Sequence, residues 1–180
     1  MLVESYIPGI RINHYQELLA AGYDLEDMGQ KLMLGFIKQV FKDGYFHGDP
    51  HPGNLIVHEG KIFFIDFGIM GHLEEGIRIT LNDILTSFTS QDVDGMTRAV
   101  LAMTTSEKQV NMTQLGRDIE RMMTRYGSIN LGLLSLSDLV EDLLQIFQKH
   151  DLQADPGITI LGKAALQIEG VFRELAPDVD

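Results

Sequence analysis

The residues most able to do chemistry lie in one short loop and one turn. The loop runs from His47 to Asn54 with the sequence His-Gly-Asp-Pro-His-Pro-Gly-Asn. Its two prolines and two glycines disfavour helix and strand, so we expect a rigid loop that presents polar side chains. Twelve residues after Asn54, Asp66 opens the turn Asp-Phe-Gly. The pattern thus supplies the carboxylates of Asp49 and Asp66 and the amide of Asn54.

Two carboxylates and an amide are oxygen ligands that suit Mg²⁺, which takes few protein ligands alongside water and substrate phosphates. Phosphoryl transfer needs such a metal to neutralise charge and a carboxylate to orient the nucleophile. Kinase catalytic loops place a catalytic Asp and a metal-binding Asn five residues apart, ahead of a hairpin and an Asp-Phe-Gly turn. Asp49 and Asn54 have this spacing, and Asp66 has this position. We predict that Asp49 is catalytic and that Asn54 and Asp66 bind Mg²⁺ and ATP; the alternative is that all three merely form turns and caps.

Hydrophobic periodicity predicts the elements that position this loop. Apolar residues recur at helical spacing from Asp24 to Lys42, with Asp24 as the N-cap and Gly44 just past the end. Apolar runs at 55–57 and 62–65 flank a His-Glu-Gly-Lys turn and predict a β-hairpin.

The two ends of the chain have different patterns. The first seven residues are mostly apolar and precede Pro8-Gly9, which predicts a short buried strand ahead of a turn. Beyond Gly71 the pattern is helical throughout. Helices are predicted over residues 74–88, 92–103, 113–126, 138–149 and 158–175, with Asp155-Pro156 capping the last.

The composition is that of an ordinary globular protein, with 44% hydrophobic and 22% charged residues among 180. A formal net charge of −12 disfavours nucleic acid as a partner, because phosphate backbones would be repelled. The absence of cysteine excludes disulfides and thiolate chemistry. No apolar run is long enough to span a membrane, so we expect a soluble, cytoplasmic chain.

At these motifs the sequence resembles the UbiB (AarF, ADCK) atypical kinase-like proteins. The resemblance rests on residues 44–54 (GYFHGDPHPGN) and 64–71 (FIDFGIMG). Pro50 favours this family over aminoglycoside and choline phosphotransferases, which more often have Leu there. Residues 2–9 (LVESYIPG) resemble the family's hinge, which implies that backbone groups near Glu4 and Tyr6 contact adenine.

The resemblance implies an α+β, mostly α fold: a protein-kinase-like C-terminal lobe with a small β-hairpin at the catalytic cleft. It implies ATP and Mg²⁺ as cofactors, and ATPase activity or small-molecule phosphoryl transfer linked to ubiquinone or other isoprenoid lipids. It also implies that His47 is a structural hydrogen-bonding residue beneath the loop. Lipid or membrane association of the parent protein would follow from family membership rather than from any feature of this chain.

We expect a single structural domain made of a hinge-like strand (1–9), the catalytic-loop and Asp-Phe-Gly region (10–75) and a helical remainder (76–180). Since the resemblance begins at the hinge, we expect a C-lobe fragment that is inactive alone and whose partner is an N-lobe or a second chain. Two alternatives stay open: an aminoglycoside- or choline-type phosphotransferase, and a non-catalytic lone-lobe binding module. The apolar stripe of the helix at 138–149 is expected to pack in the core rather than on a membrane.

Overall fold

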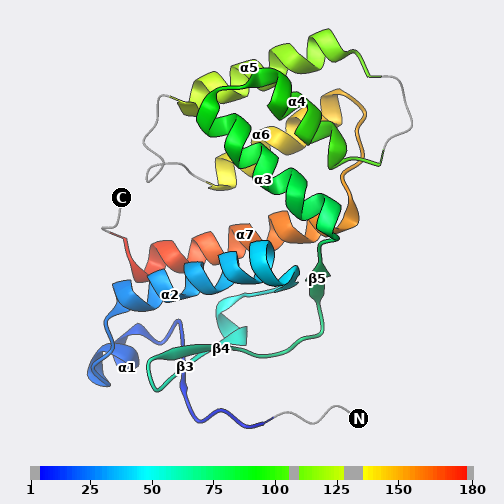
Figure 1. Ribbon diagram of the computed structural model, residues 1–180. Helices are drawn as coiled ribbons and strands as arrows, with labels where there is room; N and C mark the ends of the chain where they lie inside the picture. The colour runs from blue at the N-terminus through cyan, green and yellow to red at the C-terminus, as the bar shows by residue number, and fades with distance from the viewer. Residues whose placement is uncertain (1–4, 106–109, 128–135, 178–180) are drawn as a thin grey trace. The chain divides into compact units, whose positions relative to one another are not determined.

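The computed structural model describes residues 5–105, 110–127 and 136–177 (Figure 1). The chain forms two compact units. The first unit combines the described residues up to Gly71 with the stretch that begins at Lys163, and the second unit runs from His72 to Gly162. Helices dominate and the strands are short and antiparallel, so the predicted α+β, mostly α class is confirmed.

A three-stranded antiparallel sheet in the first unit carries the predicted hairpin. Its order is β1 (Ile10–Arg11), β3 (Leu55–His58) and β4 (Lys61–Phe64). Strands β3 and β4 pair from Leu55 opposite Phe64 to His58 opposite Lys61. Glu59 and Gly60 both have positive φ angles, 48° and 70°, as a two-residue turn of type I′ requires. The predicted hairpin is confirmed.

The strand predicted before Pro8-Gly9 is absent from the described part of that segment. Residues 5–9 form no strand, and Tyr6 is 88% exposed. Among the described residues, pairing begins after Gly9, where a Cβ atom would lie 2.5 Å from the carbonyl oxygen of Val57. The glycine lets the backbone approach β3 closely, and β1 pairs with β3 from there on. Residues 1–4 of the predicted strand lie outside the described residues. For residues 5–7 the prediction was wrong, because apolar composition does not reveal where the chain meets its partner strand.

The long helix of the first unit is confirmed in position but not in uniform geometry. After the short helix α1 (Tyr15–Ala20), α2 covers Leu25–Ile37 and continues into the π-helix η1 (Lys38–Asp43). The carboxylate of Asp24 caps α2, and Gly44 ends the segment with a φ of 72°. The wider π turn contains Gln39, whose Oε1 accepts a hydrogen bond from the amide of His47 at 2.9 Å.

The core of the first unit lies between α2, the sheet and the later part of α7 (Pro156–Leu175), which runs beside α2 (Figure 1). Gly29 of α2 faces Phe172 and Leu175 of α7 at close range. Strand β2 (Tyr45–His47) pairs with β5 (Met70–His72). The ring of Phe46 is fully buried against Gly71, where a Cβ atom would come within 2.0 Å of the ring.

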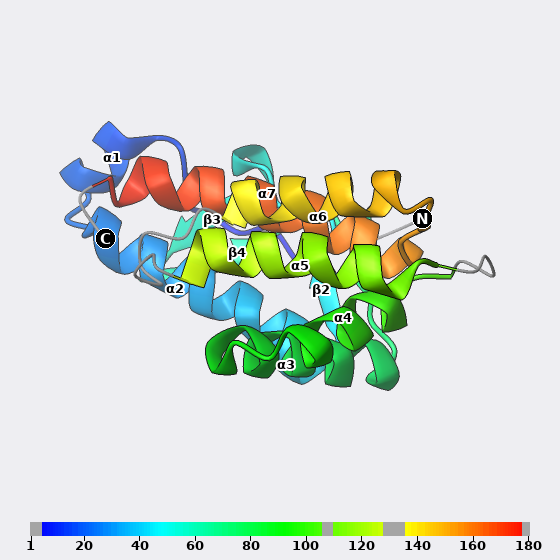
Figure 2. The ribbon, with the colours of Figure 1, turned by 90° about the horizontal axis from the view of Figure 1, so that it is seen from above.

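The second unit is helical. It contains α3 (Glu75–Ser90), α4 (Val93–Ala102), α5 (Met112–Gly127), α6 (Leu136–Lys149) and the first residues of α7. Helices α5 and α6 run side by side (Figure 2) over a shared apolar core. All five predicted helices after Gly71 are confirmed, and Asp155 caps α7 by accepting from the amide of Gly157 at 2.8 Å.

The apolar stripe of α6 contributes to this core. Ile146 and Phe147 are buried in the same cluster as Leu115 and Ile119 of α5. The expected core packing of the stripe is thereby confirmed for these residues. Among the described helices, none is long and apolar enough to cross a membrane.

Candidate active site

His47 connects the catalytic loop to the Asp-Phe-Gly turn. Its ring is 1% exposed. The Nδ1 atom accepts a hydrogen bond from the amide of Asp49 at 3.2 Å, and Nε2 lies 2.9 Å from the carbonyl oxygen of Ile65 and 3.0 Å from that of Asp66. Because an amide only donates and carbonyls only accept, these partners assign the neutral tautomer with its proton on Nε2. His47 is therefore a structural residue beneath the loop, as predicted.

Asp66 follows β4 in a conformation that few residues adopt. Its φ is 59°, in the left-handed region where Asp and Asn are tolerated better than most residues. Its Oδ1 accepts from the amide of Gly68 at 3.3 Å, which closes an Asx turn, and the residue is exposed. Within the described residues Oδ2 has no hydrogen-bond partner, so this oxygen is available to a ligand.

Asn54 ends the short 3₁₀ segment η2 (Pro52–Asn54) and is 6% exposed. Its Nδ2 donates to the carbonyl oxygen of Asp49 at 3.1 Å, and its own carbonyl oxygen accepts from the amide of Ile65 at 2.9 Å. The first bond fixes the orientation of the amide, because only nitrogen can donate to a carbonyl. Oδ1 then has no partner among the described residues. The loop and the turn meet here, since Asn54 pairs with the residue just before Asp66.

Asp49 contacts a helix that is distant in sequence. Its Oδ1 accepts from Gln167 Nε2 at 2.8 Å and from Lys163 Nζ at 3.0 Å, both on α7. These bonds, that of Gln167 first, hold the pKa of Asp49 below its ordinary value. The carboxyl side chain is 27% exposed, and Oδ2 has no partner within the described part of the chain. The prediction did not include Lys163 and Gln167; the available signal was their spacing of four, which places both on one face of the predicted helix.

The other residues of the loop and the hinge-like segment are placed less tightly. His51 is exposed and its Nδ1 accepts from the amide of Gly53 at 3.1 Å, so it packs within its own loop. Tyr6 is exposed, and Glu4 lies outside the described residues. Adenine contact by these two residues stays a prediction.

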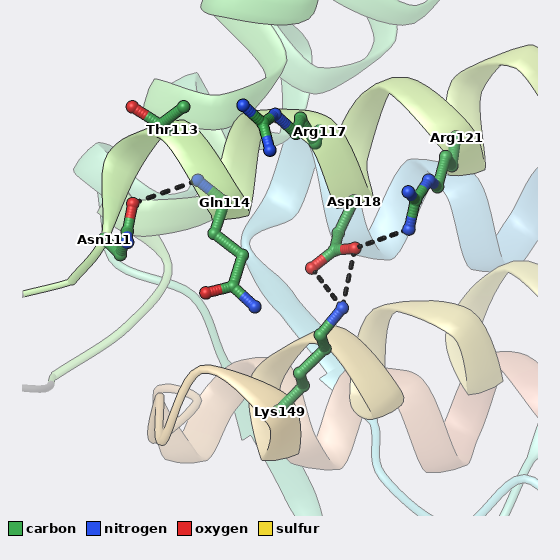
Figure 3. A pocket seen from close by; sticks show the side chains of 7 residues that line it. All are labelled: Asn111, Thr113, Gln114, Arg117, Asp118, Arg121 and Lys149. Carbon is green, nitrogen blue, oxygen red and sulfur yellow. Dashed lines mark hydrogen bonds and ion pairs between the residues drawn. The ribbon is translucent and has the colours of Figure 1, made fainter.

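A pocket of about 370 Å³ opens in the second unit (Figure 3), and its lining residues do not include Asp49, Asn54 or Asp66. Asp118 lies within it, 10% exposed. Its carboxylate binds Lys149 Nζ and His150 Nε2, each at 2.8 Å, and these bonds, that of Lys149 first, lower the pKa of Asp118. Since the carboxylate joins α5 to the end of α6, we interpret this cluster as an interhelical ion-pair network.

Comparison with known proteins gives two domain matches. Residues 1–100 match the ABC1 atypical kinase-like domain, and residues 119–180 match the UbiB helical domain. The kinase-like motifs at residues 2–9, 44–54 and 64–71 all lie within the first match.

Relatives align with nearly the whole chain. An uncharacterized protein from the hydrogenase 1 5′ region of Clostridium pasteurianum is 38% identical over 179 residues, which cover 99% of this chain and 34% of that protein. An uncharacterized protein of Mycobacterium tuberculosis is 30% identical over 179 residues, covering 98% of this chain and 37% of the relative. The chain spans about a third of the length of such relatives. The predicted resemblance is confirmed: this chain belongs to the ABC1 atypical kinase-like family, to which the UbiB-type proteins belong.

Proposed function

We propose that this chain supplies the catalytic and Mg²⁺-binding side of an ATP site in a UbiB-type protein. The observation behind the proposal is that the polar side-chain atoms of the loop and the turn are of two kinds: some are hydrogen-bonded within the protein, and others have no partner among the described residues. Asp49, Asn54 and Asp66 each use one side-chain atom in hydrogen bonds within the protein. Each keeps one oxygen without a partner among the described residues. Three such oxygens on two hydrogen-bonded segments are the donor set that phosphoryl transfer requires.

In this proposal Asn54 Oδ1 and Asp66 Oδ2 hold Mg²⁺, and Asp49 orients the attacking hydroxyl or water. Among the described residues, no three His, Cys, Asp or Glu side chains gather where a metal could bind. A site with two protein ligands nevertheless fits Mg²⁺, which binds through one or two side chains together with substrate phosphates. When bound, the ion would neutralise phosphate charge. The lowered pKa of Asp49 keeps its carboxylate ionised for orienting the nucleophile.

We further propose that the full protein hydrolyses ATP or phosphorylates a small molecule, and that its activity is linked to ubiquinone or other isoprenoid lipids. The UbiB helical match supports this link over an aminoglycoside or choline acceptor. These cases are separated by measuring ATP consumption by the full protein under four conditions. The protein is tested with no acceptor, with an isoprenoid alcohol, with choline and with an aminoglycoside. Stimulation by choline or the aminoglycoside alone would contradict the lipid link.

The first test is the thermal unfolding of this chain with Mg·ADP and with Mg²⁺ alone, for the parent sequence and for Asp66→Asn. A ligand bound only by the native state stabilises it by about 2.7 kcal/mol at a concentration of 100 times Kd. Asn can keep the turn bond to Gly68 and tolerates positive φ, so the substitution removes little except charge.

We expect a nucleotide-dependent shift that Asp66→Asn abolishes. The matched control is Asp83→Asn on α3, an exposed carboxylate with no hydrogen bond to the described residues, which should keep the shift. An equal shift in Asp66→Asn and in the parent would contradict the metal assignment.

A further inference from the structure

The contact between Asp49 and α7 joins the two regions that match different domains. Asp49 lies in the stretch that matches the kinase-like domain, whereas Lys163 and Gln167 lie in the stretch that matches the UbiB helical domain. Their bonds to Asp49 cross 114 and 118 positions of sequence. All three residues belong to the first compact unit, so the contact is internal to one packed body.

We propose that Lys163 and Gln167 are positioning residues that fix the carboxylate of Asp49 for the reaction assigned to it above, so this inference rests on the proposed function. Both side chains bind the same oxygen, Oδ1. With two donors on Oδ1, the plane of the carboxylate is set and Oδ2 is left for the incoming nucleophile. The helical region then completes the catalytic loop, instead of serving only as a support.

The orientation of Gln167 supports a specific role. Its Nε2 donates to Asp49, while its Oε1 is buried and has no hydrogen-bond partner. A buried acceptor without a donor is unfavourable. Flipping the amide would bring Oε1 against a carboxylate, which cannot donate when ionised. The residue therefore keeps an unsatisfied atom in order to keep its bond to Asp49.

Lys163 contributes charge as well as a hydrogen bond. Its side chain is 55% exposed, so its ammonium contacts both Asp49 and solvent. An ammonium group beside the carboxylate favours its ionised form, which can accept a hydrogen bond from the nucleophile.

The first arm of the test measures the mobility of the Asp49 side chain by carbon NMR relaxation at pH 7 in this chain. Lys163→Met and Gln167→Leu should each lower the order parameter of this side chain, because each removes one of the two donors to Oδ1. Gln167→Glu, which is nearly isosteric, should lower it further by replacing a donor with a second negative charge. The matched control is Lys31→Met on α2, which breaks a Lys–Asp pair to Asp27 of 2.7 Å and should leave Asp49 unchanged. An unchanged order parameter of Asp49 in all three α7 variants would overturn the proposal.

The second arm measures ATP turnover against Mg·ATP concentration in the full natural protein carrying the same substitutions. Lys163→Met and Gln167→Leu should lower kcat by up to about 100-fold with little change in KM for Mg·ATP, as expected for a misplaced reacting group. Lys31→Met should change neither kcat nor KM. A loss confined to KM would overturn the positioning role. If the unmodified protein turns over no ATP, the proposed function fails, and the NMR arm alone decides whether these residues fix Asp49.

Discussion

Replacing His47 with Ala tests how strongly one ring holds the site together. The ring accepts a hydrogen bond from the Asp49 amide, and its one N–H proton is shared between the carbonyl oxygens of Ile65 and Asp66. A hydrogen bond contributes about 1 kcal/mol net. Removing a fully buried ring also leaves a cavity, so the free energy of unfolding should fall by roughly 3–5 kcal/mol. The same loss should release the Asp-Phe-Gly turn from the catalytic loop.

Urea unfolding followed by circular dichroism measures the stability change, and native-state hydrogen exchange locates it. The amide of Asp49 should lose protection, because its acceptor is Nδ1 of the removed ring. His51→Ala is the matched control in the same loop. His51 is exposed and accepts one hydrogen bond from Gly53, so its replacement should change stability by about 1 kcal/mol or less. If both variants lost equal stability, the connecting role of His47 would be refuted.

Two further predictions concern packing and charge. Gly71→Ala would place a methyl group against the buried ring of Phe46 and should lower the free energy of unfolding in urea by about 1–3 kcal/mol. The control is Gly35→Ala in α2, where a methyl group meets open space. This change should be neutral or should stabilise the chain by up to about 1 kcal/mol. Asp118→Asn should lower the unfolding temperature at pH 7, since hydrogen bonds to a charged group are worth about 1.5–3 kcal/mol. Because the folded pKa of Asp118 is depressed, its contribution is present above the ordinary value of 3.8 and is lost as the pH falls through the lower folded value. If Asp118→Asn lowered the unfolding temperature equally at pH 7 and at acidic pH, the stabilisation by ionised Asp118 would be contradicted.

The sequence was sufficient for the elements whose signals are local. The hairpin followed from two apolar runs around Glu59-Gly60, whose composition permits the two positive φ angles that the turn needs. Helix starts at Asp24 and Asp155 followed from capping chemistry, which depends on neighbours within three residues. The role of His47 came from the family resemblance and not from the spacing.

Features that depend on distant contacts were not predictable in this way. The place where the first strand begins depends on the close approach of Gly9 to β3. The π-helical turn was not predicted either; it contains Gln39, which accepts a hydrogen bond from the amide of His47. Lys163 and Gln167 were missed because their partner lies more than a hundred residues away, and a single sequence contains no signal that links the two positions.

In the loop and the turn, some polar side-chain atoms are hydrogen-bonded within the protein and others are available to a ligand. Substitutions can therefore separate effects on stability from effects on ligand binding. His47 uses both ring nitrogens for backbone contacts, so its loss should weaken the fold before it affects any ligand. Asp66 uses Oδ1 for its turn and keeps Oδ2 unpartnered among the described residues, so Asp66→Asn should remove ligand binding while stability stays nearly constant. A loss of stability in Asp66→Asn comparable to that in His47→Ala would mean that the charge of Asp66 maintains the fold, and the assignment of its free oxygen to Mg²⁺ would then lose its physical basis.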